Sequence, residues 1–146
     1  MPNATTKAEE FSLAWRGTKA DIRMSPEEKA MYDQAIKNDD EISVRRKTHL
    51  ERYFTEFCEN DDYHRRLNDR QFKNQGKFKD GAGGKATIWT FKAWQWRGYG
   101  AIMHVGGRRA FVGVRVDPDK KNDQADRAIL NATAKIIGSL AEYGSK

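Results

Sequence analysis

Residues 98–116 hold two stretches of alternating apolar residues on either side of the pair Gly106-Gly107. Glycine adopts the positive backbone dihedrals of a tight turn at little cost, so this pair predicts a β-hairpin with a two-residue turn. Such a turn also sets which residues of the two strands face each other. The predicted strands are Gly98 to Val105 and Arg109 to Val116.

The register that follows from this turn gives the hairpin two different sides. One side is apolar and is expected to meet helices, because it pairs Val105 with Arg108, Met103 with Ala110, Ala101 with Val112 and Tyr99 with Val114. The other side pairs His104 with Arg109, Ile102 with Phe111, Gly100 with Gly113 and Gly98 with Arg115. Because two opposed glycines leave the middle of that side without side chains, we expect an open, shallow floor flanked by cations. Lys92 joins this floor if Trp89 and Phe91 of the preceding strand point to the core.

The residues around the hairpin predict helices and one further strand. Ser25, Pro26 and Glu28 are typical of a helix start, with Ser25 as the cap and Glu28 three residues later. Ala30, Met31 and Ala35 are expected on the inner side of this helix. The other predicted elements are a strand at Glu10 to Arg16, helices at Glu41 to Glu59 and Tyr63 to Arg70, a loop at Gln71 to Lys85, a strand at Ala86 to Trp94, and a last helix starting near Asn122 or Asp123.

This order of elements predicts one α+β domain over residues 1–146, an antiparallel sheet with the helices segregated to one face. We expect a flexible start at residues 1–9 and an N-terminal strand and helices at 10–70. Residues 71–146 are expected to form a basic antiparallel sheet of three or more strands, with the C-terminal helix packed on one face.

Positive charge is concentrated in the second half of the chain. Residues 70–121 carry 12 Lys and Arg but only three Asp and Glu, whereas the first 60 residues carry 10 and 12. Such a field favours a polyanion partner. No apolar run approaches the ~20 residues that span a bilayer and no leader peptide is visible, so a cytoplasmic protein without a membrane partner is expected. Cys58 is the only cysteine and the three histidines are dispersed, so neither a metal site nor a cofactor is expected.

Several side chains of the basic half have two interpretations. Trp94 and Trp96 flank a turn between strands, where they suit either base stacking or packing. His104 near Arg109 suits either a solvated surface pair or a catalytic role. Lysine and arginine neutralise phosphates and exposed rings stack on bases. The expected RNA contacts are Lys73, Lys77, Lys79, Lys85, Arg109 and Phe111.

Four segments carry a resemblance to a known family: HRRLNDRQFKNQGKFKDG at 64–81, IWTFK at 88–92, RGYGAIM at 97–103 and DPDKKNDQADRAILNA at 117–132. In this order they resemble the RelE/ParE superfamily of toxin–antitoxin toxins, in particular its HigB-like members. The resemblance covers roughly Tyr63 to Leu140, and the predicted order of elements is similar to the RelE-like fold.

The resemblance implies an mRNA endonuclease that needs no metal, cleaves RNA usually in the ribosomal A site, and is held inactive by a cognate antitoxin. In that chemistry the 2′-hydroxyl attacks the adjacent phosphate, cations stabilise the phosphoryl oxygens, and other groups move protons. Tyr143 stands where some members have a catalytic tyrosine. The catalytic residues that the resemblance implies are Lys92, Arg97, His104, Arg115, Lys120 and Lys121.

Two departures from the family pattern leave other functions open. Gly100 stands where the family has a strand arginine, and Lys92 in place of arginine loses bidentate geometry. The alternatives are a nucleic-acid-binding protein that does not cut, similar to double-stranded RNA-binding domains, and an inhibitor of a host protein, similar to ParE toxins.

Overall fold

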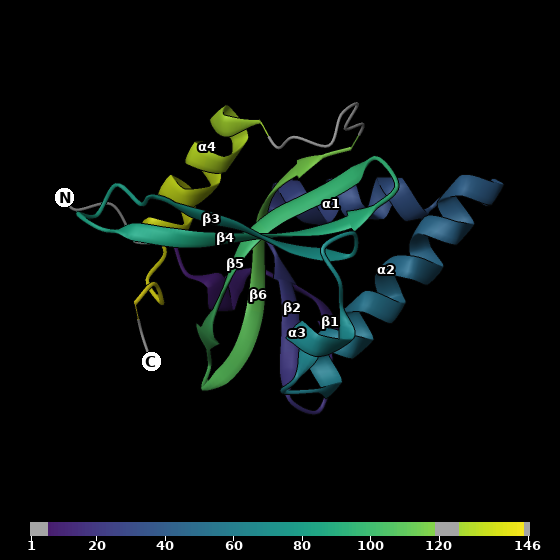
Figure 1. Ribbon diagram of the computed structural model, residues 1–146, viewed down its shortest axis with the longest axis horizontal. Coiled ribbons are helices and arrows are strands. Elements are labelled where there is room, and N and C mark those ends of the chain that lie inside the picture. Colours follow the sequence, from purple (N-terminus) through teal and green to yellow (C-terminus); the bar gives the residue numbers. More distant parts are fainter. Residues whose placement is uncertain (1–5, 119–125, 145–146) are drawn as a thin grey trace.

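The computed structural model describes residues 6–118 and 126–144, which form a sheet covered by helices on both faces (Figure 1). A single 3-10 turn at Ala8–Glu10 precedes the first strand. The remaining elements, in chain order, are β1 (Ser12–Arg16), β2 (Ala20–Met24), α1 (Pro26–Ile36), α2 (Glu41–Glu59), α3 (Tyr63–Arg66), β3 (Phe72–Lys79), β4 (Lys85–Ala93), β5 (Trp96–Val105), β6 (Arg108–Asp117) and α4 (Arg127–Gly138).

The sheet has six strands in the order β1-β2-β6-β5-β4-β3. Neighbouring strands are antiparallel except β2 and β6, which run parallel. The predicted α+β class is confirmed, but the sheet is larger than predicted and mixed. Two strands were not predicted. In β2 a charged residue, Asp21, lies among apolar ones, and β3 is rich in polar residues and contains Gly76, a composition that favours a loop.

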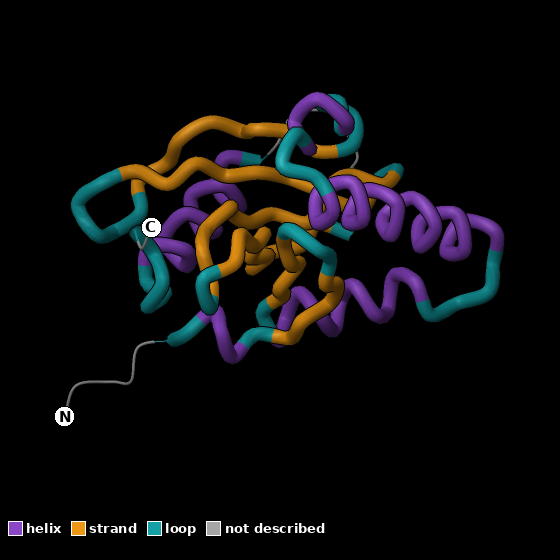
Figure 2. Tube along the Cα trace, turned by 90° about the horizontal axis from the view of Figure 1, so that it is seen from below, coloured by secondary structure: helices purple, strands orange, loops and turns teal. Residues whose placement is uncertain are grey.

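Helices cover both faces of the sheet, so the expectation of helices on one face only is wrong. On one face α4 packs over apolar residues of β5 and β6 such as Met103 and Val112. On the other face α1 and α2 enclose a second core that contains Phe91, Trp96 and Phe111. Figure 2 shows α1 and α2 side by side, joined by a loop at their outer ends.

The start of α1 connects the helix directly to the sheet. Ser25 Oγ accepts a hydrogen bond from the Glu28 backbone N–H at 3.2 Å, so the predicted cap is confirmed. The Ser25 backbone N–H donates to the Gly113 carbonyl of β6 at 2.9 Å. Because that N–H is used by β6, the Glu28 carboxylate does not close a capping box and instead turns toward the sheet.

The predicted register of the β5–β6 hairpin is confirmed from Val105–Arg108 to Gly100–Gly113. Beyond that pair the register shifts, and Tyr99 lies opposite Arg115 rather than Val114. The extra residue makes a β-bulge. The two-residue turn fixes the pairing only as far as the ladder stays regular, so it does not predict the pairs beyond the bulge.

Of the start that is expected to be flexible, residues 6–9 contact the C-terminal segment, and residues 1–5 lie outside the described part. The Ala141 backbone N–H donates to the Thr6 carbonyl at 2.9 Å. The Glu142 carboxylate accepts the backbone N–H groups of Ala8 and Glu9, each at 2.8 Å. Ala8 is fully buried as a result.

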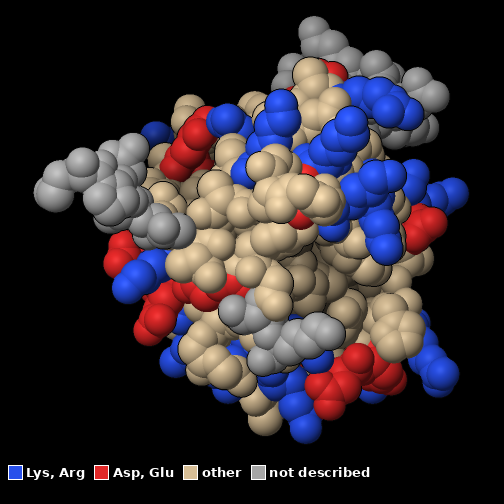
Figure 3. Space-filling view, turned by 90° about the vertical axis from the view of Figure 1, so that its left-hand side faces the viewer, with Lys and Arg blue, Asp and Glu red and all other residues tan. Residues whose placement is uncertain are grey.

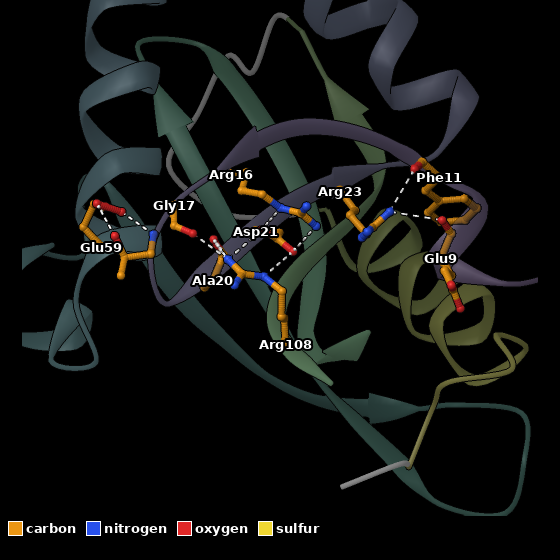
Figure 4. A network of polar contacts seen from close by, with 10 residues as sticks. Glu9, Phe11, Arg16, Gly17, Ala20, Asp21, Arg23, Glu59 and Arg108 are labelled. Atoms are coloured by element: carbon orange, nitrogen blue, oxygen red, sulfur yellow. Dashed lines mark hydrogen bonds and ion pairs between the residues drawn. The ribbon is translucent and has the colours of Figure 1, made fainter. Parts of the chain in front are cut away.

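An ionic network explains how a carboxylate is tolerated inside β2 (Figure 4). Asp21 is fully buried and accepts hydrogen bonds from Arg16 at 3.1 Å and from Arg108 at 3.0 and 3.1 Å. Although burial alone would raise it, the hydrogen bonds from Arg108 and Arg16 hold the pKa of Asp21 below its ordinary value. The network joins β1, β2 and β6.

Candidate nucleic-acid interface

The open floor that the sequence predicts on one side of the β5–β6 hairpin is closed in the structure. A side chain at Gly113 would collide with the carboxylate of Glu28, and one at Gly98 would meet Trp96 and Glu28. A side chain at Gly100 would collide with the backbone of Val112. The facing glycines therefore let α1 and β6 approach, and the expectation of an open shelf is wrong.

Two charged or aromatic residues expected on that shelf have structural roles. Phe111 is 1% exposed and packs edge-on against Phe91, with ring centroids 4.8 Å apart, so it offers no face to a base. Arg109 donates to the carbonyls of Phe57 at 2.6 Å and Asn60 at 2.9 Å, which closes the C-terminal end of α2. Arg109 also pairs with Asp61 at 2.9 Å.

The residues expected to be catalytic do not converge on one point. Lys92 lies opposite Arg97 at the turn end of β4 and β5, and Arg97 donates to the carbonyls of Trp94 and Trp96. Arg115 is on the α1 side of the sheet, where its guanidinium contacts Glu27 at 3.1 Å.

His104 lies near the opposite end of β5, seven residues from Arg97, which is about 23 Å along an extended strand. Lys120 and Lys121 lie outside the described residues, as does the predicted helix start at Asn122 and Asp123. The described residues thus separate His104 from the other cations that the resemblance implies.

The structure builds a different basic surface where two strands of the sheet separate. β4 and β5 pair from Trp89–Gly100 to Ala93–Trp96, and among the described residues no pairing continues beyond Trp89–Gly100. A hollow of about 310 Å³ lies between the diverging strands. Its walls include Lys85, Thr87 and Trp89 of β4, Ile102 and His104 of β5, and Tyr143 near the C-terminus.

Three lysines of the β3–β4 hairpin lie on the same side of the sheet as Trp89. In the β3–β4 register Lys77 faces Thr87 and Lys79 faces Lys85, while Thr87 and Lys85 alternate with Trp89 along one side of β4. We call Lys77, Lys79 and Lys85, together with the hollow, the hairpin groove. Figure 3 views the end of the molecule where this hairpin lies, and shows Lys and Arg gathered beside a hollow in the surface.

A β-bulge excludes Lys73 from this set. The register of β3 shifts between Asn74 and Gly76, so Lys73 lies opposite Thr90, on the sheet side that faces α4. Without the extra residue, the lysines of β3 would all share one side. Of the four expected lysine contacts, Lys77, Lys79 and Lys85 are together and Lys73 is not.

The loop at the tip of the hairpin is held by Asp80. Its carboxylate accepts the backbone N–H groups of Ala82 at 2.7 Å and Gly84 at 3.0 Å, and the hydroxyl of Tyr143. These hydrogen bonds, that of Tyr143 foremost, lower the pKa of Asp80. Burial and the bond to Asp80 in turn raise the pKa of Tyr143 to about 12. A preformed glycine loop therefore lies between Lys79 and Lys85.

The sequence contained a signal for this groove that the loop prediction missed. Lys77 and Lys79 are two residues apart with Phe78 between them, which is the alternation of a strand with one charged side. Phe78 packs against the core beside α4, on the side opposite the two lysines. Trp89 lines the groove because β4 and β5 diverge, and Asp80 holds the loop with the help of Tyr143 near the C-terminus. Neither contact is between residues that are neighbours in the sequence.

Two further observations concern metals and membranes. In residues 6–118 and 126–144, no three His, Cys, Asp or Glu side chains are grouped so that they could hold a metal ion. The described part of the chain contains no helix with the length and apolar character needed to cross a membrane.

Comparison of the chain with protein-family models, with curated proteins and with solved structures gave no match.

Proposed function

We propose that this protein binds single-stranded RNA in the hairpin groove, and that it is a RelE/HigB-like toxin that cleaves the bound strand without a metal. The observation that carries the proposal is the pair Lys79 and Lys85, which face each other across a preformed loop beside an aromatic hollow. The resemblance of four sequence segments to RelE/HigB toxins supports the same proposal.

The lysine pair supports a phosphate ligand. Like charges directly opposite each other in an antiparallel pair destabilise the sheet, and a bound anion removes that repulsion. A second concave space, lined by Lys79, Lys85 and glycines of the loop, has a volume of about 540 Å³ and adjoins the pair. The phosphates of a polyanion suit this arrangement, because lysine ammonium groups bind them electrostatically and the backbone of the glycine loop leaves room for them.

The hollow supports a single strand rather than a duplex. Trp89 and His104 line it together with apolar atoms of Ile102. Unstacked bases of a single strand can enter such a hollow and stack on aromatic rings, whereas the bases of an A-form duplex are covered by their neighbours.

Cleavage requires a group that takes the proton of the attacking 2′-hydroxyl. Among the residues that line the hollow, His104 carries an imidazole whose nitrogen can accept a proton, and its side chain is exposed. In the proposed step the 2′-oxygen forms a bond to phosphorus while the bond from phosphorus to the 5′-oxygen breaks. His104 takes the 2′-proton, the leaving 5′-oxygen receives a proton from water, and Lys85 stabilises the phosphoryl charge.

RNA binding is tested with labelled single-stranded RNA and with a duplex of the same sequence, titrated at several salt concentrations. The double variant Lys79→Ala/Lys85→Ala should weaken binding and lower the slope of log affinity against log salt by about 0.7 per lost phosphate contact. Lys47→Ala, which removes an exposed charge from α2, should leave the slope unchanged. Equal slopes for the wild type and the double variant would contradict the proposed site.

Cleavage is tested by incubating the RNA with the protein and a metal chelator, with and without ribosomes. The wild type should produce fragments that end in a cyclic phosphate, and His104→Asn should bind RNA but leave it intact. Expression of the wild type should arrest growth, and a co-expressed antitoxin should relieve the arrest. If the wild type binds RNA but never cuts it, the non-cleaving alternative is correct.

A further inference from the structure

Trp94 is an exposed aromatic side chain at the turn between β4 and β5. It is 45% exposed, whereas Trp96, two residues later, is 1% exposed and packs in the core beneath α1 and α2. The pair Ala93–Trp96 closes this turn, which therefore contains only Trp94 and Gln95. The two interpretations that the sequence left open thus separate: Trp96 packs, and Trp94 presents its ring to solvent.

The backbone of Trp94 is in a conformation that its residue type disfavours. Its φ is 54°, and among the described residues it is the only one other than glycine with a positive φ. Glycine or asparagine adopts this conformation at lower cost than a bulky residue does. Strained positions that persist are concentrated at binding sites, so the strain at Trp94 is an observation independent of its exposure.

The indole ring of Trp94 is held by a histidine from α2. The rings of His49 and Trp94 are stacked, with centroids 4.7 Å apart and an angle of 24° between their planes. His49 is itself held by Tyr53, whose hydroxyl lies 3.3 Å from His49 Nδ1. One face of the indole is therefore covered by a fixed imidazole, and the exposure of the ring belongs to its other face and its edge.

Two arginines contact residues that form or hold this pair of rings. The Arg97 guanidinium donates to the Trp94 carbonyl, and Lys92 lies opposite Arg97 in the β4–β5 register. On α2, the Arg52 guanidinium lies 5.3 Å from the centre of the Tyr53 ring. On β6, Asp117 lies opposite Arg97. The register therefore places one acidic residue, Asp117, beside two basic ones, Arg97 and Lys92.

We infer that Trp94 and His49 form a stacking platform for an unpaired nucleobase, with Arg97 beside it to contact an adjoining phosphate. This inference rests on the proposed RNA binding and adds a second contact to it. Lys85 and Trp94 are nine residues apart along β4, which is about 30 Å in an extended strand. The hairpin groove and the platform are thus contacts for two separate parts of one RNA strand.

The test compares Trp94→Gly, Trp94→Phe and wild type in binding a single-stranded RNA and an oligonucleotide of equal length that lacks bases. Trp94→Gly removes the ring and relieves the backbone, so it should fold with an unchanged or higher melting temperature. It should weaken RNA binding about tenfold, equivalent to about 1.4 kcal/mol, without changing the salt slope or the binding of the baseless strand. Trp94→Phe should retain most of the affinity, and Ile42→Ala, which truncates another exposed apolar residue, should have no effect.

The outcomes separate the platform from the groove. If Trp94→Gly binds RNA as the wild type does while Lys79→Ala/Lys85→Ala still reduces the salt slope, the platform is wrong and the proposed function stands. If Trp94→Gly weakens binding to the baseless strand equally, the residue does not stack on bases and the platform is again wrong. If the wild type fails to bind RNA at low salt, both are wrong.

Discussion

Replacing Glu28 by glutamine should remove a large part of the pH dependence of folding. Glu28 is fully buried between α1 and the sheet, and neither carboxylate oxygen has a hydrogen-bond partner among the described residues. Burial raises its pKa well above the ordinary value. The unfolded chain, in contrast, releases the proton of a glutamate near pH 4.3.

The sign of the effect follows from which state holds the proton more tightly. Below about pH 4 both states are protonated at Glu28, and its contribution to stability is at its full value. Above that pH the unfolded state loses the proton first, so the free energy of unfolding falls as the pH rises. The fall is at most about 1.4 kcal/mol per pH unit, or about 2.7 kcal/mol between pH 5 and 7, and it stops once the pH passes the folded-state pKa.

The assay is urea denaturation at pH 5, 6 and 7. The free energy of unfolding of Glu28→Gln relative to the wild type should increase with pH by up to these amounts, because glutamine stays neutral. Glu27→Gln is the matched control, since Glu27 is exposed and pairs with Arg115. Asp21 does not interfere, because its lowered pKa affects stability only in acid, where stability is lost as the pH falls. Parallel pH profiles for wild type and Glu28→Gln would show that Glu28 is solvated, and that α1 does not close the floor of the sheet.

Other perturbations test the remaining structure. Phe111→Ala should lower the free energy of unfolding by about 3–5 kcal/mol in urea denaturation, because the ring is 1% exposed; a loss below 1 kcal/mol would place it at the surface. Asp21→Asn should cost about 2 kcal/mol, since it weakens charged hydrogen bonds to Arg16 and Arg108; a neutral result would mean that these bonds are not formed. Cys58 should react with a disulfide reagent only after urea is added, because burial raises its pKa to about 12; rapid labelling of the native protein would contradict its position on the buried side of α2.

Elements with local sequence signals were predictable. The start of α1 is one of them, but the side of α1 that is buried could not be predicted in this way. The apolar residues Ala30, Met31 and Ala35 predicted the inner side of this helix, yet its buried residues are Glu28 and Tyr32. A hydrophobic pattern assigns glutamate to the solvent side. The N–H of Ser25 is taken by a β6 carbonyl, and this contact between segments far apart in the chain turns Glu28 inward.

The candidate site was predictable in part for the same reason. The lysines of the hairpin groove follow from charge and sequence position, and three of the four share one side of the sheet. The place of Lys73 depends on a bulge, because the extra residue in β3 puts Lys73 on the side of the sheet opposite to Lys77 and Lys79. Arg115 keeps its predicted side, that of Gly113, although the bulge in the β5–β6 pair changes its cross-strand partner to Tyr99. Whether a bulge forms is decided by the partner strand and is not visible in the residues themselves.

The amino-acid sequence by itself determined the elements whose stability is local: the cap at Ser25, the turn at Gly106-Gly107 with its register, the long helix at 41–59 and the basic character of the second half. Only the tertiary structure decided that Asp21 lies inside a strand, that β2 joins β6 in parallel, and which part of each sheet face is left uncovered by helices. These features depend on contacts between residues many tens of positions apart. A buried charge is stable only where distant arginines meet it, and a sheet face is open only where no distant helix packs on it.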